Sequence, residues 1–464
     1  MARRPRHPRS RHGDGHCRDR PSLFSTHRAL RMVRTADLVL LAWLVFLAGR
    51  AFGENFIAGA DVSHLKFFED RGVVYRDDGQ VGDALEILQR RGVNCVRLRL
   101  FTSSTAQALA DPYNRINNLD YTLALAVRSR QAGLKVLLDF HYSDTWADPG
   151  KQTKPAAWAN LSFTELEQRM VEYNSNCISS FRAAGVMPDY VQMGNEITSG
   201  MLWPEGRVGG AYENATQWSQ FGRLIKAAIR GIHDASGPQR PKIIIHIDRG
   251  GDWAATQWYF DNLQRQQVEF DIIGQSYYPF WHGDLNALSN CLHRAAGRYA
   301  KPLIIMETAF PWANSGNVVG FPATPTGQSD YVLQLAKILK SVPDGLGTGI
   351  FWWGTEYQHL DRVQTAGFEF RGFFNAEGDV LPAARTLGQL STPVVLKAAL
   401  TGTDQITLHW PLSGAGLALV NSPSLLSSEL WRPTNPPIET NTLTFETTLP
   451  VGDEPVSFFR LQAN

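Results

Sequence analysis

Eight short apolar runs recur along the chain from residue 56 onward, and longer amphipathic segments separate them. The runs cover residues 56–63, 94–101, 135–143, 190–197, 242–249, 270–278, 303–310 and 349–356. Several are almost continuous Val, Ile and Leu, which is typical of parallel strands that helices bury on both faces. Helical periodicity lies between them, at residues 81–91, 121–132, 164–184, 218–235 and 331–341. Alternating strands and helices predict an α/β fold, and eight such units predict a closed (β/α)8 TIM barrel over residues 54–390.

The pattern changes near residue 391, where short alternating runs with turn residues replace the strand and helix units. These runs cover residues 406–410, 417–420, 442–445 and 456–461. Short strands of this kind predict a small all-β, sandwich-like module over residues 391–464. The module contains no pair of acidic residues suited to catalysis, so we expect the chemistry to lie in the barrel.

The first 53 residues differ from the rest of the chain. Residues 1–34 are rich in Arg, His and Pro, and an apolar run follows at 38–48. That run is short for a membrane span, and its basic flank and the small residues at 51–53 are typical of a secretory signal peptide. Met32 is an alternative start with a leader of ordinary length. We expect a secreted or extracytoplasmic protein, with an uncleaved membrane anchor as the alternative.

The charge balance argues against a nucleic-acid partner or an acidic substrate. The 464 residues carry a formal net charge of +1, and 43% of them are hydrophobic, enough for a large core. A neutral ligand fits this balance better. The 13 Trp residues are suited to sugar rings, whose C–H faces are apolar. We expect a monomer, with membrane contact only if the leader stays uncleaved.

Cysteine and histidine usage predicts neither a disulfide framework nor a metal centre. Without the leader and its Cys17, the chain keeps Cys95, Cys177 and Cys291, an odd number. Cys95 lies in an apolar run and is expected to pack as a small hydrophobic residue. No Cys and His cluster has the spacing of a zinc site, so we expect no catalytic metal and no cofactor.

Polar and aromatic residues gather where the eight apolar runs end. In a TIM barrel these ends meet at one face, and that face holds the active site. A single polar residue there often serves only to bind loop backbone, and this alternative stays open for His64, His246, Asp248 and Tyr278. The residues are Asp61, His64, Arg97, Arg99, His141, Asp144, Asn195, Glu196, His246, Asp248, Tyr277, Tyr278, Glu307, Trp352 and Trp353.

Two glutamates stand out at these strand ends, Glu196 and Glu307. They are 307 − 196 = 111 residues apart, which places them on the fourth and seventh strands. A pair of carboxyl groups across a cleft is the equipment for hydrolysing a glycosidic bond. Glu196 is expected to be protonated because a neighbouring carboxylate raises its pKa, and Arg97 or Arg99 would keep Glu307 ionised. A separation of about 5 Å would give retention, and about 6.5–9.5 Å inversion.

Longer sequence segments indicate which kind of glycoside hydrolase this chain resembles. Gly-Ala-Asp-Val-Ser at 59–63, the segment 138–152 (LDFHYSDTWADPGKQ), Gln-Met-Gly-Asn-Glu-Ile at 192–197, residues 200–206 (GMLWPEG) and Glu-Thr-Ala-Phe-Pro at 307–311 resemble glycoside hydrolase family 53. That family comprises arabinogalactan endo-β-1,4-galactanases, so the resemblance implies a retaining hydrolase acting on β-1,4-galactan or arabinogalactan. It implies Glu196 as acid/base and Glu307 as nucleophile. It also implies substrate contacts from Asp61, Arg97, His141, Asn195, Tyr277 and Trp353.

One string departs from the family pattern. After the eighth strand the family usually has an aromatic residue followed by Trp-Glu-Pro, whereas residues 351–357 read FWWGTEY. Trp353 keeps the stacking position, but the acidic residue and the proline that follow it are absent. The subsite formed by this loop, and the calcium bound there in some members, are therefore not carried over to this chain.

The sequence is also compatible with two other functions. The first keeps the mechanism on another β-glycan, such as a mannan or a glucan. The second is a non-catalytic barrel that only binds carbohydrate, and the presence of both glutamates argues against it.

Overall fold

The computed structural model describes residues 56–401, 405–423, 430–441, 444–450 and 457–463. The predicted leader, residues 1–53, lies outside these ranges. Among the described residues, none of the helices has the length and apolar character needed to cross a membrane.

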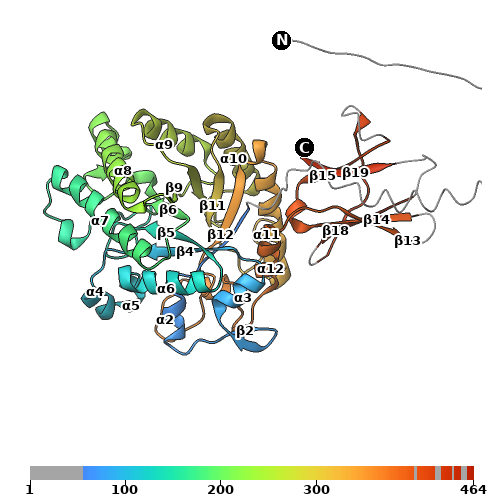
Figure 1. The fold of residues 1–464 in the computed structure, drawn as a ribbon, viewed down its shortest axis with the longest axis horizontal. Helices are drawn as coiled ribbons and strands as arrows, with labels where there is room; N and C mark the ends of the chain where they lie inside the picture. Colours follow the sequence, from blue (N-terminus) through green and yellow to red (C-terminus); the bar gives the residue numbers. More distant parts are fainter. Residues whose placement is uncertain (1–55, 402–404, 424–429, 442–443, 451–456, 464) are drawn as a thin grey trace, which may run out of the picture. The chain divides into compact units, whose positions relative to one another are not determined.

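Eight parallel strands close into a barrel, which confirms the predicted TIM fold (Figure 1). The order around the barrel is β1-β12-β11-β10-β9-β6-β5-β4, so each strand pairs with the next barrel strand of the chain. Glu196 follows the fourth of these strands and Glu307 lies on the seventh, as predicted. The strands are β1 Ile57–Asp61, β4 Cys95–Leu100, β5 Lys135–Phe140, β6 Tyr190–Met193, β9 Lys242–Ile247, β10 Ile272–Ser276, β11 Leu303–Thr308 and β12 Gly347–Trp352.

Helices connect the strands and cover the outside of the barrel (Figure 1). Side-chain caps define several starts: Ser162 and Glu165 form a reciprocal capping box at α7, and Asn214 accepts a hydrogen bond from the backbone of Gln217 at α8. The helices are α2 Leu65–Glu69, α3 Ala84–Arg90, α4 Thr105–Ala110, α5 Pro112–Arg115, α6 Leu119–Gln131, α7 Phe163–Ala183, α8 Ala215–Ser236, α9 Trp253–Arg265, α10 Leu285–Tyr299, α11 Pro325–Lys340 and α12 Pro382–Gln389.

Short elements fill the loops. Two small antiparallel ribbons pair β2 Tyr75–Asp77 with β3 Gln80–Gly82, and β7 Gly200–Met201 with β8 Gly206–Arg207. The 3-10 turns are η1 Ala156–Trp158, η2 Ile197–Ser199, η3 Gly210–Tyr212, η4 Pro343–Gly345, η5 Phe368–Phe370 and η6 Leu412–Gly414. Turn η2 and the β7–β8 ribbon follow the Asn195-Glu196 turn along the chain.

The core has two layers. A small cluster made only of strand residues fills the barrel interior: Ile57, Cys95, Leu137, Ile244, Ile272, Ile304, Met306 and Phe351. Cys95 is therefore a packed core residue, as expected. Gly59 makes room for this filling, because a Cβ there would lie 2.2 Å from the Phe351 ring. A larger cluster packs the helices against the outside of the strands.

The C-terminal residues form two small antiparallel sheets. One has the order β13-β14-β18-β17 and the other β16-β15-β19. The runs predicted near 406, 417, 442 and 456 correspond to β14, β15, β18 and β19, although residues 442–443 and 456 lie outside the described ranges. The strands are β13 Lys397–Thr401, β14 Gln405–Pro411, β15 Leu417–Ser422, β16 Arg432–Pro433, β17 Glu439–Thr440, β18 Thr444–Pro450 and β19 Phe458–Ala463. The sandwich arrangement and the domain boundary stay predictions.

Candidate active site

A cavity of about 510 Å³ lies where the barrel strands end, and both predicted catalytic glutamates line it. The segments after β5, β6, β9, β10 and β12, together with Glu307 of β11, supply most of its wall. Its residues are Arg99, Tyr113, His141, Trp146, Ala147, Asp148, Pro149, Asn195, Glu196, Asp248, Tyr278, Trp281, His282, Glu307, Trp353, Thr365, Ala366 and Phe368. The mixture of aromatic faces and a few carboxyl groups suits a neutral, ring-shaped ligand.

Glu196 is held by a tight turn after β6. Gly194 has φ 75°, and Glu196 itself has φ 50° and ψ 50°, a left-handed conformation that non-glycine residues adopt at an energetic cost. The turn brings Glu196 Oε1 to 2.6 Å from the Ser276 hydroxyl, which donates to it. Burial, together with the carboxylates of Glu307 and Asp248, raises the pKa of Glu196 well above its ordinary value. The raised pKa favours the protonated form of Glu196, which is the form a general acid needs.

Glu307 lies on β11 and is held from two sides. Its Oε1 is 2.8 Å from Arg97 Nη1, and its Oε2 accepts a hydrogen bond of 3.0 Å from the Tyr278 hydroxyl. Burial raises the pKa of Glu307, whereas the Arg97 guanidinium opposes this rise. Among the described residues no cation is paired with Glu196, so the two carboxyl groups of one cavity differ in their electrostatic setting. That is the arrangement an acid and a nucleophile require.

Arg97 is fully buried and lies beneath the cavity rather than in its wall. Besides Glu307 it contacts Asp61 Oδ2 at 2.9 Å, Asp139 Oδ2 at 2.8 Å, Gln192 Oε1 at 3.0 Å and Asn195 Oδ1 at 2.8 Å. A planar guanidinium with this many partners has a fixed position. Arg97 therefore orients Glu307 and Asn195, as predicted for the nucleophile, but the structure does not bring it to the substrate cavity.

Asp61 ends β1 and is also buried away from the cavity. Its Oδ1 accepts hydrogen bonds from the backbone and hydroxyl of Ser63. Burial acts to raise its pKa, but Arg99 and Arg97 hold the pKa below its ordinary value. Asp61 is thus an ionised partner of two arginines and does not line the cavity, although the resemblance implied a substrate contact from it.

His141 and Asn195 do line the cavity. The backbone N–H of Ala147 donates to His141 Nδ1 at 3.0 Å, which leaves Nε2 as the protonated nitrogen, 3.0 Å from Asp139 Oδ2. Asn195 Nδ2 donates to the Ala147 carbonyl at 2.9 Å, while its Oδ1 accepts from Arg97. One hydrogen of the Asn195 amide thus stays available to a ligand at the cavity surface.

Of the two tyrosines after β10, the structure directs Tyr278 and not Tyr277 into the cavity. Tyr277 is fully buried, and its hydroxyl donates to the Gly283 carbonyl at 2.9 Å. Adjacent residues of an extended chain point to opposite sides, so only one of them can face the glutamates. The contact predicted for Tyr277 therefore falls to Tyr278, which binds Glu307.

Trp353 follows β12 and forms part of an aromatic wall. Its ring centroid is 4.1 Å from that of Phe368 and 6.3 Å from that of Trp146, and the Arg99 guanidinium lies 4.2 Å from the Trp146 centroid. Trp352 instead is fully buried, and its indole N–H donates to the Arg371 carbonyl. Trp353 is therefore the cavity residue of this pair, as predicted.

A family model described as glycosyl hydrolase family 53 matches residues 57–387, which include the whole barrel. An arabinogalactan endo-beta-1,4-galactanase of Thermothelomyces thermophilus is 36% identical, over 65% of this chain and 90% of that protein. One of Humicola insolens is 33% identical, with the same coverage. The solved catalytic domain of an Ignisphaera aggregans family 53 protein superimposes with a TM-score of 0.64 at 33% identity, over 72% of this chain and 95% of that one.

The chain belongs to glycosyl hydrolase family 53. A further solved structure, of fungal beta-1,4-galactanases, covers 71% of this chain and 98% of its own, with a TM-score of 0.63 and 33% identity. Both superpositions and the family model agree with the barrel described above. The family 53 assignment makes this chain a glycoside hydrolase.

The loop in which this family 53 chain departs from the expected string has a buried acid of its own. Glu356 is fully buried, and its Oε1 accepts from the backbone N–H of His64 at 2.7 Å. Burial and the Asp61 carboxylate raise the pKa of Glu356 to about 8. This chain therefore has an acidic residue three positions after Trp353 instead of directly after it. The hydrogen bond of Glu356 connects the loop to His64, after β1.

The other polar residues at the strand ends differ in their contacts. His246 contacts Ser276, and Asp248 lines the cavity while accepting from Thr198 and Arg249. His64 binds the Tyr113 carbonyl through Nε2, and Asp144 accepts from Thr102, Gln107 and the backbone of Ala156. His64 and Asp144 therefore have structural roles, whereas Asp248 belongs to the site.

Several residues of the site were not identified from the sequence. Trp281, His282, Phe368 and Tyr113 line the cavity, and buried Ser276 donates a hydrogen bond to Glu196. Trp281 is 63% exposed and lies at the cavity rim. The run Tyr-Tyr-Pro-Phe-Trp-His at 277–282, directly after a strand, was a usable signal for Trp281 and His282. Tyr113 lies in the short helix α5 and Phe368 in η5, and neither directly follows a barrel strand, so the sequence carries no such marker for them.

Metal-binding clusters and disulfides are not found in the described part of the chain. There, no group of three or more His, Cys, Asp and Glu residues could hold a metal ion. Cys95, Cys177 and Cys291 are free and buried.

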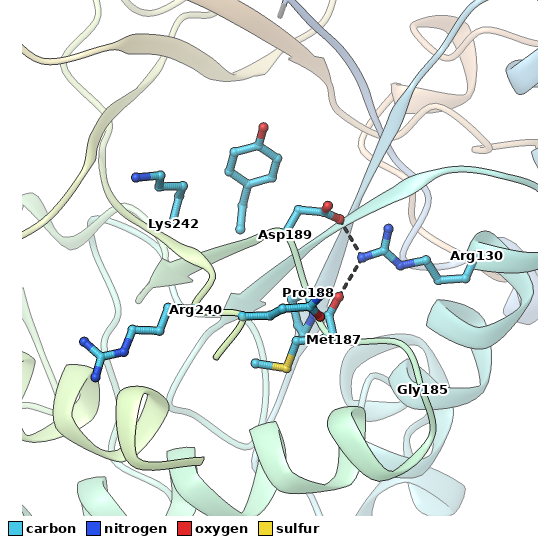
Figure 2. Close-up of a pocket in the computed structure, with 9 residues that line it drawn as sticks. Arg130, Gly185, Met187, Pro188, Asp189, Arg240 and Lys242 are labelled. Carbon is cyan, nitrogen blue, oxygen red and sulfur yellow. Dashed lines mark hydrogen bonds and ion pairs between the residues drawn. The ribbon is translucent and has the colours of Figure 1, made fainter. Parts of the chain in front are cut away.

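A second cavity, of about 530 Å³, lies at the opposite end of the barrel, where β6 and β9 begin. Figure 2 shows the Arg130 side chain directed at the Asp189 carboxylate, with Arg240 and Lys242 nearby. Arg130 is 2.6 Å from Asp189 Oδ2, and Lys242 is 3.1 Å from Asp271 Oδ1. Arg130 and Lys242 therefore already have carboxylate partners, and neither Glu196 nor Glu307 lies here.

Proposed function

We propose that this chain is an endo-acting, retaining β-1,4-galactanase that cleaves galactan and type I arabinogalactan. The observation that supports this most is the pair Glu196 and Glu307 in one cavity, where Arg97 binds Glu307 and no cation of the described ranges is paired with Glu196. The galactanases among the relatives support the choice of sugar.

In the first step, protonated Glu196 gives its proton to the glycosidic oxygen. Glu307 attacks the anomeric carbon, and the new bond forms as the bond to the leaving oxygen breaks with its electron pair. Arg97 and Tyr278 favour the ionised form of Glu307 and fix the direction of its carboxylate.

In the second step, Glu196 acts as a base and takes a proton from water. The water oxygen attacks the anomeric carbon, and the bond to Glu307 breaks, so the configuration at that carbon is retained overall. Both steps use side chains of the chain itself, and we propose that no cofactor and no catalytic metal take part.

The substrate contacts follow from the cavity wall. The free hydrogen of the Asn195 amide is placed to bind a sugar hydroxyl beside Glu196. The Trp353 ring offers an apolar face for the sugar at the cleaved bond. Asp61 and Arg97 do not touch the substrate themselves. Arg97, which Asp61 binds, orients Glu307 and Asn195, and these two contact the sugar.

Export of the enzyme is part of the proposal, because a polysaccharide cannot enter a cell intact. The apolar run at 38–48, with its basic flank, supports a signal peptide and a secreted or extracytoplasmic location. We also propose that the enzyme acts as a monomer, since every group assigned to the two steps comes from one chain.

Product analysis on linear β-1,4-galactan tests this function. The enzyme should release galacto-oligosaccharides of mixed length, and proton NMR should detect the β-anomer of the new reducing end before mutarotation. Matched samples of mannan, glucan and xylan should stay intact. Cleavage of mannan or glucan without cleavage of galactan would overturn the sugar assignment, and an α-anomer formed first would overturn retention.

A further inference from the structure

A chain of two hydrogen bonds runs from Glu196 into the barrel wall. Ser276, the last residue of β10, is fully buried, and its Oγ lies 2.6 Å from Glu196 Oε1. The same Oγ lies 2.8 Å from Nε2 of His246, a fully buried residue of β9. His246 Nδ1 is buried and has no hydrogen-bond partner among the residues that the structure describes.

Strand geometry places these groups together. In the pairing of β10 with β9, Gly274 is opposite His246. The pairing of β10 with β11 shifts register between Gln275 and Ser276. A shift of this kind re-aims a side chain, and here it occurs at the residue whose hydroxyl meets Glu196.

The unpartnered nitrogen decides the direction of the chain. If His246 carried its proton on Nδ1, a buried donor would have no acceptor. Nε2 would then also compete with Glu196 for the single hydroxyl proton of Ser276. With the proton on Nε2, His246 donates to Ser276 Oγ and Ser276 donates to Glu196 Oε1, so both bonds are made.

Burial, with Arg97, His141 and His282 nearby, holds the pKa of His246 well below its ordinary value, so the ring is neutral and keeps one proton. The direction of the two hydrogen bonds is thus fixed as long as the ring stays neutral. Glu196 Oε1 always accepts from Ser276.

We propose that Ser276, oriented by neutral His246, is a positioning residue that reserves Oε1 of Glu196 as a hydrogen-bond acceptor and makes Oε2 the oxygen that gives and takes the catalytic proton. This inference rests on the proposed role of Glu196 as acid/base. In the first step the proton leaves Oε2 for the glycosidic oxygen. In the second step Oε2 takes one proton from the attacking water, so the protons balance and the Ser276 bond is unchanged.

The pH profile of Ser276→Ala carries the main test. Five influences act on the Glu196 carboxyl: burial, Glu307 and Asp248 raise its pKa, whereas the Ser276 hydrogen bond and Arg97 lower it. Removal of the hydroxyl should therefore raise this pKa. Because activity needs protonated Glu196, the alkaline limb of kcat/KM should move to higher pH.

The leaving group gives a second readout. In Ser276→Ala the acid is less well aimed, so kcat/KM on linear galactan should fall about tenfold or more. A dinitrophenyl β-galactobioside, whose leaving group needs little protonation, should lose far less. Ser276→Thr keeps a hydroxyl and should restore both readouts, and His246→Phe should reproduce the effect in weaker form.

Ser129→Ala is the matched control. Ser129 is also fully buried, and its hydroxyl binds the Leu125 carbonyl within α6, away from the cavity. The Ser129→Ala variant should be less stable. It should not move the alkaline limb of kcat/KM, and it should not change the ratio of kcat/KM on galactan to kcat/KM on the dinitrophenyl substrate. If Ser276→Ala behaves like Ser129→Ala, the inference is wrong.

Glu196→Ala, measured beside these variants, separates the inference from the proposed function. One outcome is that Glu196→Ala loses kcat/KM on galactan selectively while Ser276→Ala leaves the alkaline limb of its pH profile in place. That result would overturn the role of Ser276 and leave the acid assignment of Glu196 intact. Equal loss on both substrates in Glu196→Ala would overturn the acid assignment and the inference with it.

Discussion

The two ends of the barrel hold cavities of similar volume, about 510 Å³ at the strand ends and about 530 Å³ where β6 and β9 begin. Their charges differ in burial. In the pair Arg130–Asp189 the side chains are 29% and 30% exposed, whereas in Arg97–Glu307 they are 0% and 8% exposed. Water screens the first pair, so it interacts weakly, while the second interacts in a low-dielectric setting. Burial of charge, and not cavity volume, distinguishes the catalytic end.

The largest expected effect is that of Glu307→Ala. Without the nucleophile no glycosyl–enzyme bond can form, so kcat on galactan should fall on the order of 10⁴-fold or more. The unfolding transition should stay cooperative. Added azide should restore part of the activity on an activated galactoside and give a product of inverted configuration. Near-normal activity without azide would end this assignment.

Glu196→Ala should come next. Loss of the general acid should lower kcat/KM on galactan by about 10²- to 10⁴-fold. A dinitrophenyl galactoside should be cleaved nearly as fast as before in the first step, because its leaving group departs without protonation. Comparison of the two substrates checks this, and equal losses would remove Glu196 from the role.

Matched arginine variants test the contrast between the two ends. Arg97→Met leaves Asp139 and Glu307 as buried carboxyl groups without their arginine, and Asp61 with Arg99 alone, so the free energy of unfolding should fall by about 3–5 kcal/mol. Arg130→Met removes a half-exposed pair and should change the free energy of unfolding by about 1 kcal/mol or less. Urea titrations measure both. Similar losses in the two variants would break the comparison.

Adjacent tryptophans give a smaller contrast. Trp353→Ala should lower kcat/KM about tenfold, equivalent to about 1.4 kcal/mol, with nearly unchanged Tm, because the ring faces the cavity. Trp352→Ala should instead destabilise the protein by about 3–5 kcal/mol, since that ring is fully buried against Phe373. Steady-state kinetics and thermal melts separate the two, and a large loss of Tm with normal kinetics in Trp353→Ala would make it a core residue.

The smallest expected effect is a shift of the pH profile in Asp248→Asn. The Asp248 carboxylate raises the pKa of Glu196, so its neutralisation should lower that pKa. Activity requires protonated Glu196, and the alkaline limb of kcat/KM should therefore move to lower pH, opposite to Ser276→Ala. Maximal kcat should change less than about tenfold. A limb that moves upward would contradict the assigned electrostatics.

The barrel could be predicted from the sequence because burial of both faces makes each strand a continuous apolar run. The ends of the strands were predicted less accurately. The apolar run predicted a strand over residues 190–197, whereas β6 ends at Met193 and a turn with positive φ begins at Gly194. Both glutamates and Trp353 were placed correctly, since their spacing follows the βα repeat. Apolar pattern alone does not show where backbone pairing stops.

Side-chain direction and long-range partners could not be predicted. Tyr277 and Tyr278 are identical in type, and the choice between them depends on the register shift in β10. The role of Arg97 beneath Glu307 depends on three carboxylates from three strands. Ser276 is a small residue at a strand end, and only its distance to Glu196 gives it a role.

Trapping of the covalent intermediate tests the central claim most directly. A 2-deoxy-2-fluoro galactobiosyl donor with a good leaving group should inactivate the enzyme, because the fluorine slows hydrolysis of the glycosyl–enzyme bond more than its formation with such a leaving group. Peptide mass spectrometry should then find the sugar on Glu307, at the strand-end cavity, and Glu307→Ala should take up none. A label on Glu196 or elsewhere in the chain, or turnover without any adduct and with an inverted product, would contradict the account.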